Sequence, residues 1–219
     1  MISVVIPTDN SERHLPRCFD GLIPSAVRGM VREVIVSDAG SNDATLEIAD
    51  AAGAHIVHAR KGRGAQLADG AAVAKSDWLL FLHPETSLEP GWEVEAESFI
   101  DQAQMERPRA AVFRFALEDF SGEARRAEAK VALRTAVFAL PYGDQGLLIP
   151  KRLYQKLGGY RALADMEDAD LVRRIGRRRL VSLRARAVNI ARPPKGALRG
   201  LALALLHALR IPSGVLARL

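Results

Sequence analysis

The sequence predicts a single α/β domain with a doubly wound, mostly parallel mixed sheet flanked by helices. Short apolar runs alternate with helical segments from residue 2 to residue 82, the order typical of parallel sheets. One run, 77–82, is too short to cross a membrane and ends at a polar turn containing proline. Such a run is best explained as a strand buried on both faces, so we expect it to be central.

The first half of the chain follows a β-α order. A strand at 2–6 ends at Pro7, and Asn10 or Ser11 can cap the helix that follows. The further elements expected before the central strand are strands at 34–36 and 56–57, and helices at 45–52 and 65–74.

Polar loops follow the predicted strands, where open α/β sheets bind ligands. They carry Thr8 and Asp9, Asp38, the basic stretch 60–63, and the pair His83 and Glu85. Neither a dinucleotide fingerprint nor a P-loop is present. Carboxylates for a ribose or metal, beside a basic loop for phosphate, suggest a site for a mononucleotide or its sugar derivative.

Several of these residues have two possible roles. His83 and Glu85 could hold a divalent cation or simply form a capped turn. Asp38 is favoured as functional because the Ala-Gly after it offers no helix to cap, whereas Asp43 is favoured as a helix cap. The basic side chains of 60–63 contact phosphate or are merely solvated.

Composition narrows the partners. The formal charge of +5 and the pI near 9.7 favour anionic partners. Aromatic residues are only 5%, and no basic stretch is interleaved with them, which argues against a base-stacking nucleic-acid surface. A lone Cys18 excludes an internal disulfide, and no basic leader is seen, so we expect a cytoplasmic protein.

The second half adds helices at 92–104, 124–138 and 151–157 and strands at 111–117 and 147–149. The loop 141–146 contains Asp144, whose side chain could hydrogen-bond to its own turn. An acidic cluster then opens a helix that runs to about residue 176. Asp165 and Asp170 are assigned to helix capping and pairing, but four acids in this cluster exceed what a helix start needs.

Five motifs in order resemble family 2 glycosyltransferases, especially a small bacterial branch, over about residues 2–190. They are 4–8 (VVIPT), 38–45 (DAGSNDAT), 83–86 (HPET), 158–160 (GGY) and 166–171 (MEDADL). The resemblance implies the GT-A fold, a nucleotide-sugar donor, Mg²⁺ or Mn²⁺, and inversion at the anomeric carbon. It also implies a domain at 1–195, with a nucleotide-sugar-binding half at 1–92 and an acceptor half at 93–195.

The resemblance assigns roles to individual residues. Asp168 and Glu167 become the catalytic pair, and Asp144 and Gln145 contact the acceptor. Glu85 and His83 stand where the family has its Asp-x-Asp metal motif, a departure that puts the metal geometry in question. The donor-binding residues are Pro7, Thr8, Asp9, Asp38, Gly40, Arg60, Lys61, Arg63 and Gln66.

The segment 196–219 predicts an apolar, basic helical tail. It is too short and too basic to span a bilayer. It could lie on a membrane as a peripheral contact, or pack on the domain or in a homodimer, and packing is favoured.

The sequence thus predicts a metal-assisted inverting transferase that moves a sugar from a nucleotide diphosphate, UDP rather than GDP, to a hydroxyl acceptor. A nucleotidyltransferase is the first alternative, but residues 7–10 lack its glycine-rich, arginine-containing loop. The second is a non-catalytic nucleotide-sugar-binding protein, which the altered metal motif would suit.

Overall fold

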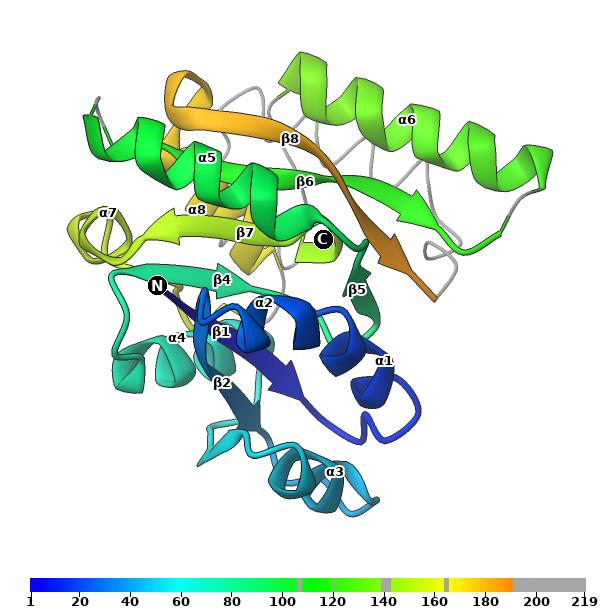
Figure 1. The fold of residues 1–219 in the computed structure, drawn as a ribbon, viewed down its shortest axis with the longest axis vertical. Coiled ribbons are helices and arrows are strands. Elements are labelled where there is room, and N and C mark those ends of the chain that lie inside the picture. The colour runs from blue at the N-terminus through cyan, green and yellow to red at the C-terminus, as the bar shows by residue number, and fades with distance from the viewer. Residues whose placement is uncertain (106–107, 120, 139–142, 164–165, 191–219) are drawn as a thin grey trace.

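The computed structural model describes residues 1–105, 108–119, 121–138, 143–163 and 166–190. Within them the chain forms an eight-stranded mixed sheet with helices on both faces, in the order β3-β2-β1-β4-β7-β6-β8-β5 (Figure 1). The predicted α/β class is confirmed. The strands are β1 (Ile2–Thr8), β2 (Val31–Asp38), β3 (His55–His58), β4 (Trp78–Phe81), β5 (Thr86–Leu88), β6 (Ala110–Leu117), β7 (Leu147–Pro150) and β8 (Leu180–Asn189). The α-helices are α1 (Leu15–Asp20), α2 (Ile23–Val27), α3 (Thr45–Ala51), α4 (Arg63–Val73), α5 (Trp92–Met105), α6 (Gly122–Phe138), α7 (Lys151–Lys156) and α8 (Glu167–Ile175).

The first half of the sheet is parallel and the second half is mixed. Strands β3, β2, β1 and β4 all run in one direction. Strand β7 is antiparallel to both β4 and β6, β6 is parallel to β8, and β5 is antiparallel to β8. The carboxyl ends of β1, β2 and β4 therefore meet at one edge of the sheet.

Strand β4 lies between β1 and β7, so it is central, as predicted, and both its faces are buried. Leu80 packs into the core on one face of the sheet, together with α1, α3 and α5. Leu79 and Phe81 pack into the core on the other face, together with α4, α7 and α8. A strand covered on both sides reads as a continuous apolar run, which is the pattern of 77–82.

Two expectations about the first loop were wrong. Strand β1 continues through Pro7 to Thr8. Pairing with β4 ends at Val5, so no ladder partner on that side needs the N–H that proline lacks. Helix α1 begins only at Leu15, with His14 at its N-cap and no side-chain cap, because the Ser11 carbonyl accepts from the backbone N–H groups of His14 and Leu15 in a preceding turn.

Strands β5 and β8 were not predicted. Strand β8 does carry a period-two signal: Leu183, Ala185 and Ala187 are buried, while the intervening residues are more exposed. The arginines at alternate positions obscured that signal. The predicted tail, 196–219, lies outside the described residues. Among the helices that are described, none is long and apolar enough to cross a membrane.

Candidate active site

Asp38 closes the carboxyl end of β2 and organises the loop after it. One carboxylate oxygen accepts from the hydroxyls of Thr8 and Ser41, and the other accepts from the backbone N–H groups of Gly40 and Ser41, both at 2.8 Å. Burial raises the pKa of Asp38, but these hydrogen bonds outweigh it and hold the pKa below its ordinary value of 3.8. Asp38 is thus an ionised, 1% exposed anchor, and its bonds join β1 to the 38–41 loop.

Two neighbouring residues also have structural roles. Gln66 is buried, and its amide nitrogen donates to the carbonyls of Thr8 at 2.7 Å and Ser37 at 3.0 Å, which ties α4 to β1 and β2. The N-cap of α3 is Ala44 rather than the predicted Asp43, but from the preceding position Asp43 accepts from the backbone N–H of Thr45, the first helical residue, at 3.0 Å. Asp9, by contrast, is exposed at the end of β1.

The basic loop divides into residues with different partners. Arg60 forms an exposed pair with Asp69, with a shortest N···O distance of 2.7 Å. Lys61 is exposed. Arg63, at the start of α4, lies 3.4 Å from the Glu167 carboxylate at the start of α8. The sequence-predicted phosphate and catalytic residues are therefore brought together through Arg63.

Gly64 allows the start of α4 to lie close to the segment that leads into α8. A Cβ at this position would lie 2.1 Å from the carbonyl oxygen of Arg161 and 3.2 Å from the Cβ of Glu167. Only glycine allows the α4 backbone to reach the segment that leads into α8.

His83 and Asp168 face one another. His83 follows β4, and its Nε2 lies 4.0 Å from an oxygen of Asp168, which belongs to the first turn of α8. That nitrogen is buried and has no hydrogen-bond partner among the described residues. Burial lowers the pKa of His83 below 6.5, more than the Asp168 carboxylate raises it, so the ring is neutral at pH 7.

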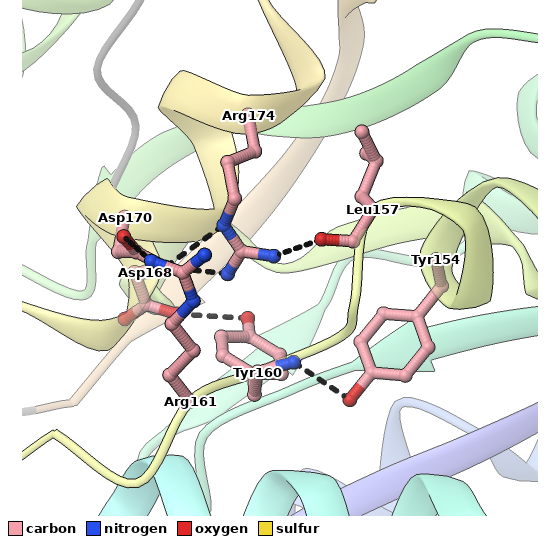
Figure 2. Close-up of polar contacts among 7 residues, drawn as sticks. All are labelled: Tyr154, Leu157, Tyr160, Arg161, Asp168, Asp170 and Arg174. Carbon is pink, nitrogen blue, oxygen red and sulfur yellow. Dashed lines mark hydrogen bonds and ion pairs between the residues drawn. The ribbon is translucent and has the colours of Figure 1, made fainter.

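The other oxygen of Asp168 accepts a hydrogen bond from the Tyr160 hydroxyl at 2.9 Å (Figure 2). Burial raises the pKa of Tyr160 well above 10, and the adjacent carboxylate adds to this effect, so the phenol remains a donor. Asp168 is itself only 6% exposed.

The rest of the acidic cluster behaves as expected where it is described. Asp170 accepts from the Arg174 side chain, with an Nε···O distance of 2.9 Å, and Arg161 lies 3.4 Å from the same carboxylate (Figure 2). Arg174 also donates to the carbonyl of Leu157 at 2.6 Å. The assignment of Asp170 to helix pairing is confirmed, and Asp165 lies outside the described residues.

The predicted metal pair, His83 and Glu85, lies in the segment between β4 and β5. Glu85 is half-buried, and its charge contributes to the pKa values of both His83 and Cys18. In the described part of the chain, no three His, Cys, Asp or Glu side chains gather as a metal cluster. The unpartnered Nε2 of His83 is a nitrogen donor for a divalent cation, and the carboxylate of Glu85 is the type of oxygen donor that Mg²⁺ and Mn²⁺ prefer.

The predicted acceptor loop is held by its neighbours. Gln145 is buried, accepts from the Thr135 hydroxyl at 2.9 Å and donates to the Phe113 carbonyl at 3.1 Å. Its amide therefore stabilises the loop. The Asp144 carbonyl accepts from the Asn189 side chain at 2.8 Å, so the end of β8 also fixes this loop. A hollow of about 360 Å³ lies between α6, β6 and β8, and shares Gln145 with the predicted site.

Sequence reasoning missed Tyr160 and Asn189 as site residues. The 158–160 motif was noticed, but its tyrosine was given no role. Its signal was the pair of glycines before it: Gly158 and Gly159 both have positive φ, +80° and +61°. Asn189 gave no signal, because the strand that carries it was not predicted.

The mixed sheet with helices on both faces is the fold of the GT-A glycosyltransferases. Residues 3–120 match the family described as Glycosyl transferase family 2, more than half of the chain. The protein belongs to this family and is a glycosyltransferase. Among curated proteins no sequence match was found.

Solved structures share the fold at low identity. Glucosyl-3-phosphoglycerate synthase from Mycobacterium tuberculosis, crystallised with Mn²⁺, UDP and glucosyl-3-phosphoglycerate, is 22% identical, with a TM-score of 0.66 over 97% of this chain and 81% of that chain. The same enzyme with Mg²⁺ and UDP is 21% identical, with a TM-score of 0.66 over 97% and 80%. S. aureus TarS is 16% identical, with a TM-score of 0.67 over 94% and 65%.

Proposed function

We propose that this glycosyltransferase moves a sugar from a UDP-sugar to a hydroxyl acceptor with inversion, assisted by Mg²⁺ or Mn²⁺. The observation that carries the proposal is the meeting of His83, Asp168, Glu167 and Arg63 beyond the carboxyl end of β4. In this proposal Arg63 binds phosphate, the imidazole of His83 binds the metal, and the buried carboxylate of Asp168 is the base. The similar synthase binds UDP, Mn²⁺ and phosphoglyceric acid, which supports the same donor and metal here.

Two groups of residues would bind the donor, one at the nucleoside and one at the diphosphate. The loop built on Pro7, Thr8, Asp38 and Gly40 forms the nucleoside wall, and Asp9 is the exposed carboxylate at its edge. Arg63 and Lys61 are placed to approach the diphosphate. Arg60 and Gln66, which were also predicted to bind the donor, support the loop through Asp69 and through the ends of β1 and β2.

His83 and Glu85 would hold the divalent cation, which when bound offsets the charge that develops on the leaving diphosphate. Asp168 takes the proton of the acceptor hydroxyl as the new glycosidic bond forms. Glu167 lies beside Arg63 and next to Asp168, so it holds the phosphate-binding side chain and the base at a fixed distance from each other. Asp144 lies on the loop predicted to bind the acceptor and would contact the acceptor.

The test is a donor panel: UDP-glucose, UDP-galactose, UDP-N-acetylglucosamine and GDP-mannose, each with and without Mn²⁺. Thermal melts report binding, since a ligand stabilises the fold in proportion to the logarithm of its concentration above Kd. UDP or GDP release is measured with water, glycerol 3-phosphate or phosphoglyceric acid as acceptor. We expect UDP, but not GDP, to raise Tm, with a larger rise when Mn²⁺ is present. Absence of any nucleotide effect would contradict the proposal.

A further inference from the structure

We propose that Tyr160 is a positioning residue: its hydroxyl fixes the carboxylate of Asp168 so that the second oxygen faces His83 and the acceptor. The inference rests on the proposed function, in which Asp168 is the base. It adds a residue to which the sequence analysis gave no role in the reaction.

The first step is how the chain places Tyr160. Gly159 has φ +61°, and a Cβ there would lie 2.9 Å from the Tyr154 hydroxyl oxygen. The backbone can therefore turn tightly against Tyr154, whose hydroxyl accepts from the Tyr160 N–H at 3.0 Å (Figure 2). The turn after α7 thus directs the Tyr160 ring into the core on the face of the sheet that α4, α7 and α8 cover.

The second step is what holds the ring. Tyr160 is 6% exposed and packs edge-on against Phe81, with ring centroids 4.9 Å apart and planes at 85°. Phe81 is the last residue of β4, two positions before His83. The hydroxyl that reaches Asp168 is therefore fixed relative to the strand that carries His83.

The third step is what the hydrogen bond does. The last side-chain torsion of an aspartate has a broad range of favourable angles, so packing alone does not fix the positions of its two carboxylate oxygens. The 2.9 Å bond from Tyr160 fixes one oxygen, and the other is then the one that lies 4.0 Å from His83 Nε2. Tyr160 so selects which oxygen of Asp168 is presented to the reaction.

A purely structural role is already filled by other contacts. Asp170, Arg174 and the Leu157 carbonyl join the first turns of α8 to the end of α7 without Tyr160 (Figure 2). The start of α8 is thus tied down independently, and the contact between Tyr160 and Asp168 is free to serve orientation.

The test compares Tyr160→Phe with the control Ser25→Ala, because each removes one buried hydroxyl that donates one hydrogen bond, and Ser25 on α2 donates only to the Leu22 carbonyl, away from the proposed site. UDP release from the UDP-sugar selected by the panel is measured with Mn²⁺ and the best acceptor, or with water. We expect Tyr160→Phe to lower kcat about 10-fold to 100-fold, the effect of a misplaced catalytic group, with donor KM and UDP affinity within about twofold of wild type. Ser25→Ala should lower Tm by a similar amount and keep kcat.

A double variant adds a readout that structural damage would not move. Because Tyr160 acts through Asp168, adding Tyr160→Phe to Asp168→Asn should lower turnover no further than Asp168→Asn alone. The inference would be overturned, with the proposed function left standing, by a wild-type kcat in Tyr160→Phe. A double variant whose loss of turnover is the product of the two single losses would overturn it in the same way. If the wild-type protein releases UDP from no donor, the proposed function fails, and this inference with it.

Discussion

Replacing Asp38 separates its structural role from direct donor contact. Asp38→Ala deletes both acceptor oxygens and leaves the N–H groups of Gly40 and Ser41 without their partner. One hydrogen bond to a charged group is worth about 1.5–3 kcal/mol, and Asp38 accepts four that share one buried carboxylate, so the free energy of unfolding should fall by at least that amount. For a domain of this size, this corresponds to a drop of roughly 3–12 °C in Tm.

Asp38→Asn should be much milder. Its oxygen can still accept from the two backbone N–H groups, and its NH₂ can donate to the hydroxyls of Thr8 and Ser41, which rotate to accept. Urea unfolding and UDP titration are measured for both variants, with the exposed Asp9→Ala as the stability control, expected within about 0.5 kcal/mol of wild type. If Asp38→Asn is as stable as wild type yet loses UDP binding, the carboxylate contacts the nucleoside directly and our reasoning is wrong.

The same network predicts a pH dependence. The pKa of Asp38 is lower in the folded protein than its ordinary value of 3.8. Its contribution is therefore complete above pH 3.8 and is lost as pH falls below 3.8 through the folded-state pKa. The stability difference between wild type and Asp38→Ala should be constant from pH 7 to pH 5 and narrow below pH 4. A difference that widens on acidification would refute the assignment.

Three further predictions concern the loops around the site. Gly64→Ala should lower the free energy of unfolding by about 1–3 kcal/mol in urea, because the new methyl group meets a carbonyl oxygen at 2.1 Å; an unchanged midpoint would contradict the close approach. Glu85→Ala should remove the Mn²⁺-dependent part of UDP binding by thermal shift, and Glu85→Asp should keep it; equal Mn²⁺ effects in all three proteins would exclude Glu85 as a ligand. Arg60→Ala should change stability by less than about 1 kcal/mol and leave UDP affinity within about twofold, because the Arg60 side chain pairs with Asp69 at the surface; a large loss of affinity would return Arg60 to the phosphate site.

What the sequence predicted well depended on local pattern. The apolar run 77–82 identified the central strand, and the position of polar residues after strands placed Thr8, Asp38 and His83 at one edge of the sheet. The acidic cluster was predicted to open a helix, and α8 begins at Glu167. Each of these signals lies within a few consecutive residues, so one sequence is enough to detect it.

What it missed depended on contacts between distant segments. The role of Asp38 depends on Thr8, thirty positions away, and Arg63 meets Glu167 only because Gly64 lets two segments touch. The partnership of Tyr160 and Asp168 requires a left-handed turn whose direction no periodicity reveals. Such contacts are set by tertiary packing, which local propensity does not determine.

The central claim is that Asp168 is the base of a glycosyl transfer, and turnover of Asp168→Asn tests it most directly. Asn is nearly the same size but cannot take a proton. A positioned base is worth about 10²–10⁴ in rate, so UDP release should fall by that factor while UDP affinity stays near that of wild type. Glu167→Gln is the matched control, since it changes the neighbouring carboxylate, and it should lose less turnover. Wild-type turnover in Asp168→Asn, with a normal melt, would contradict the account.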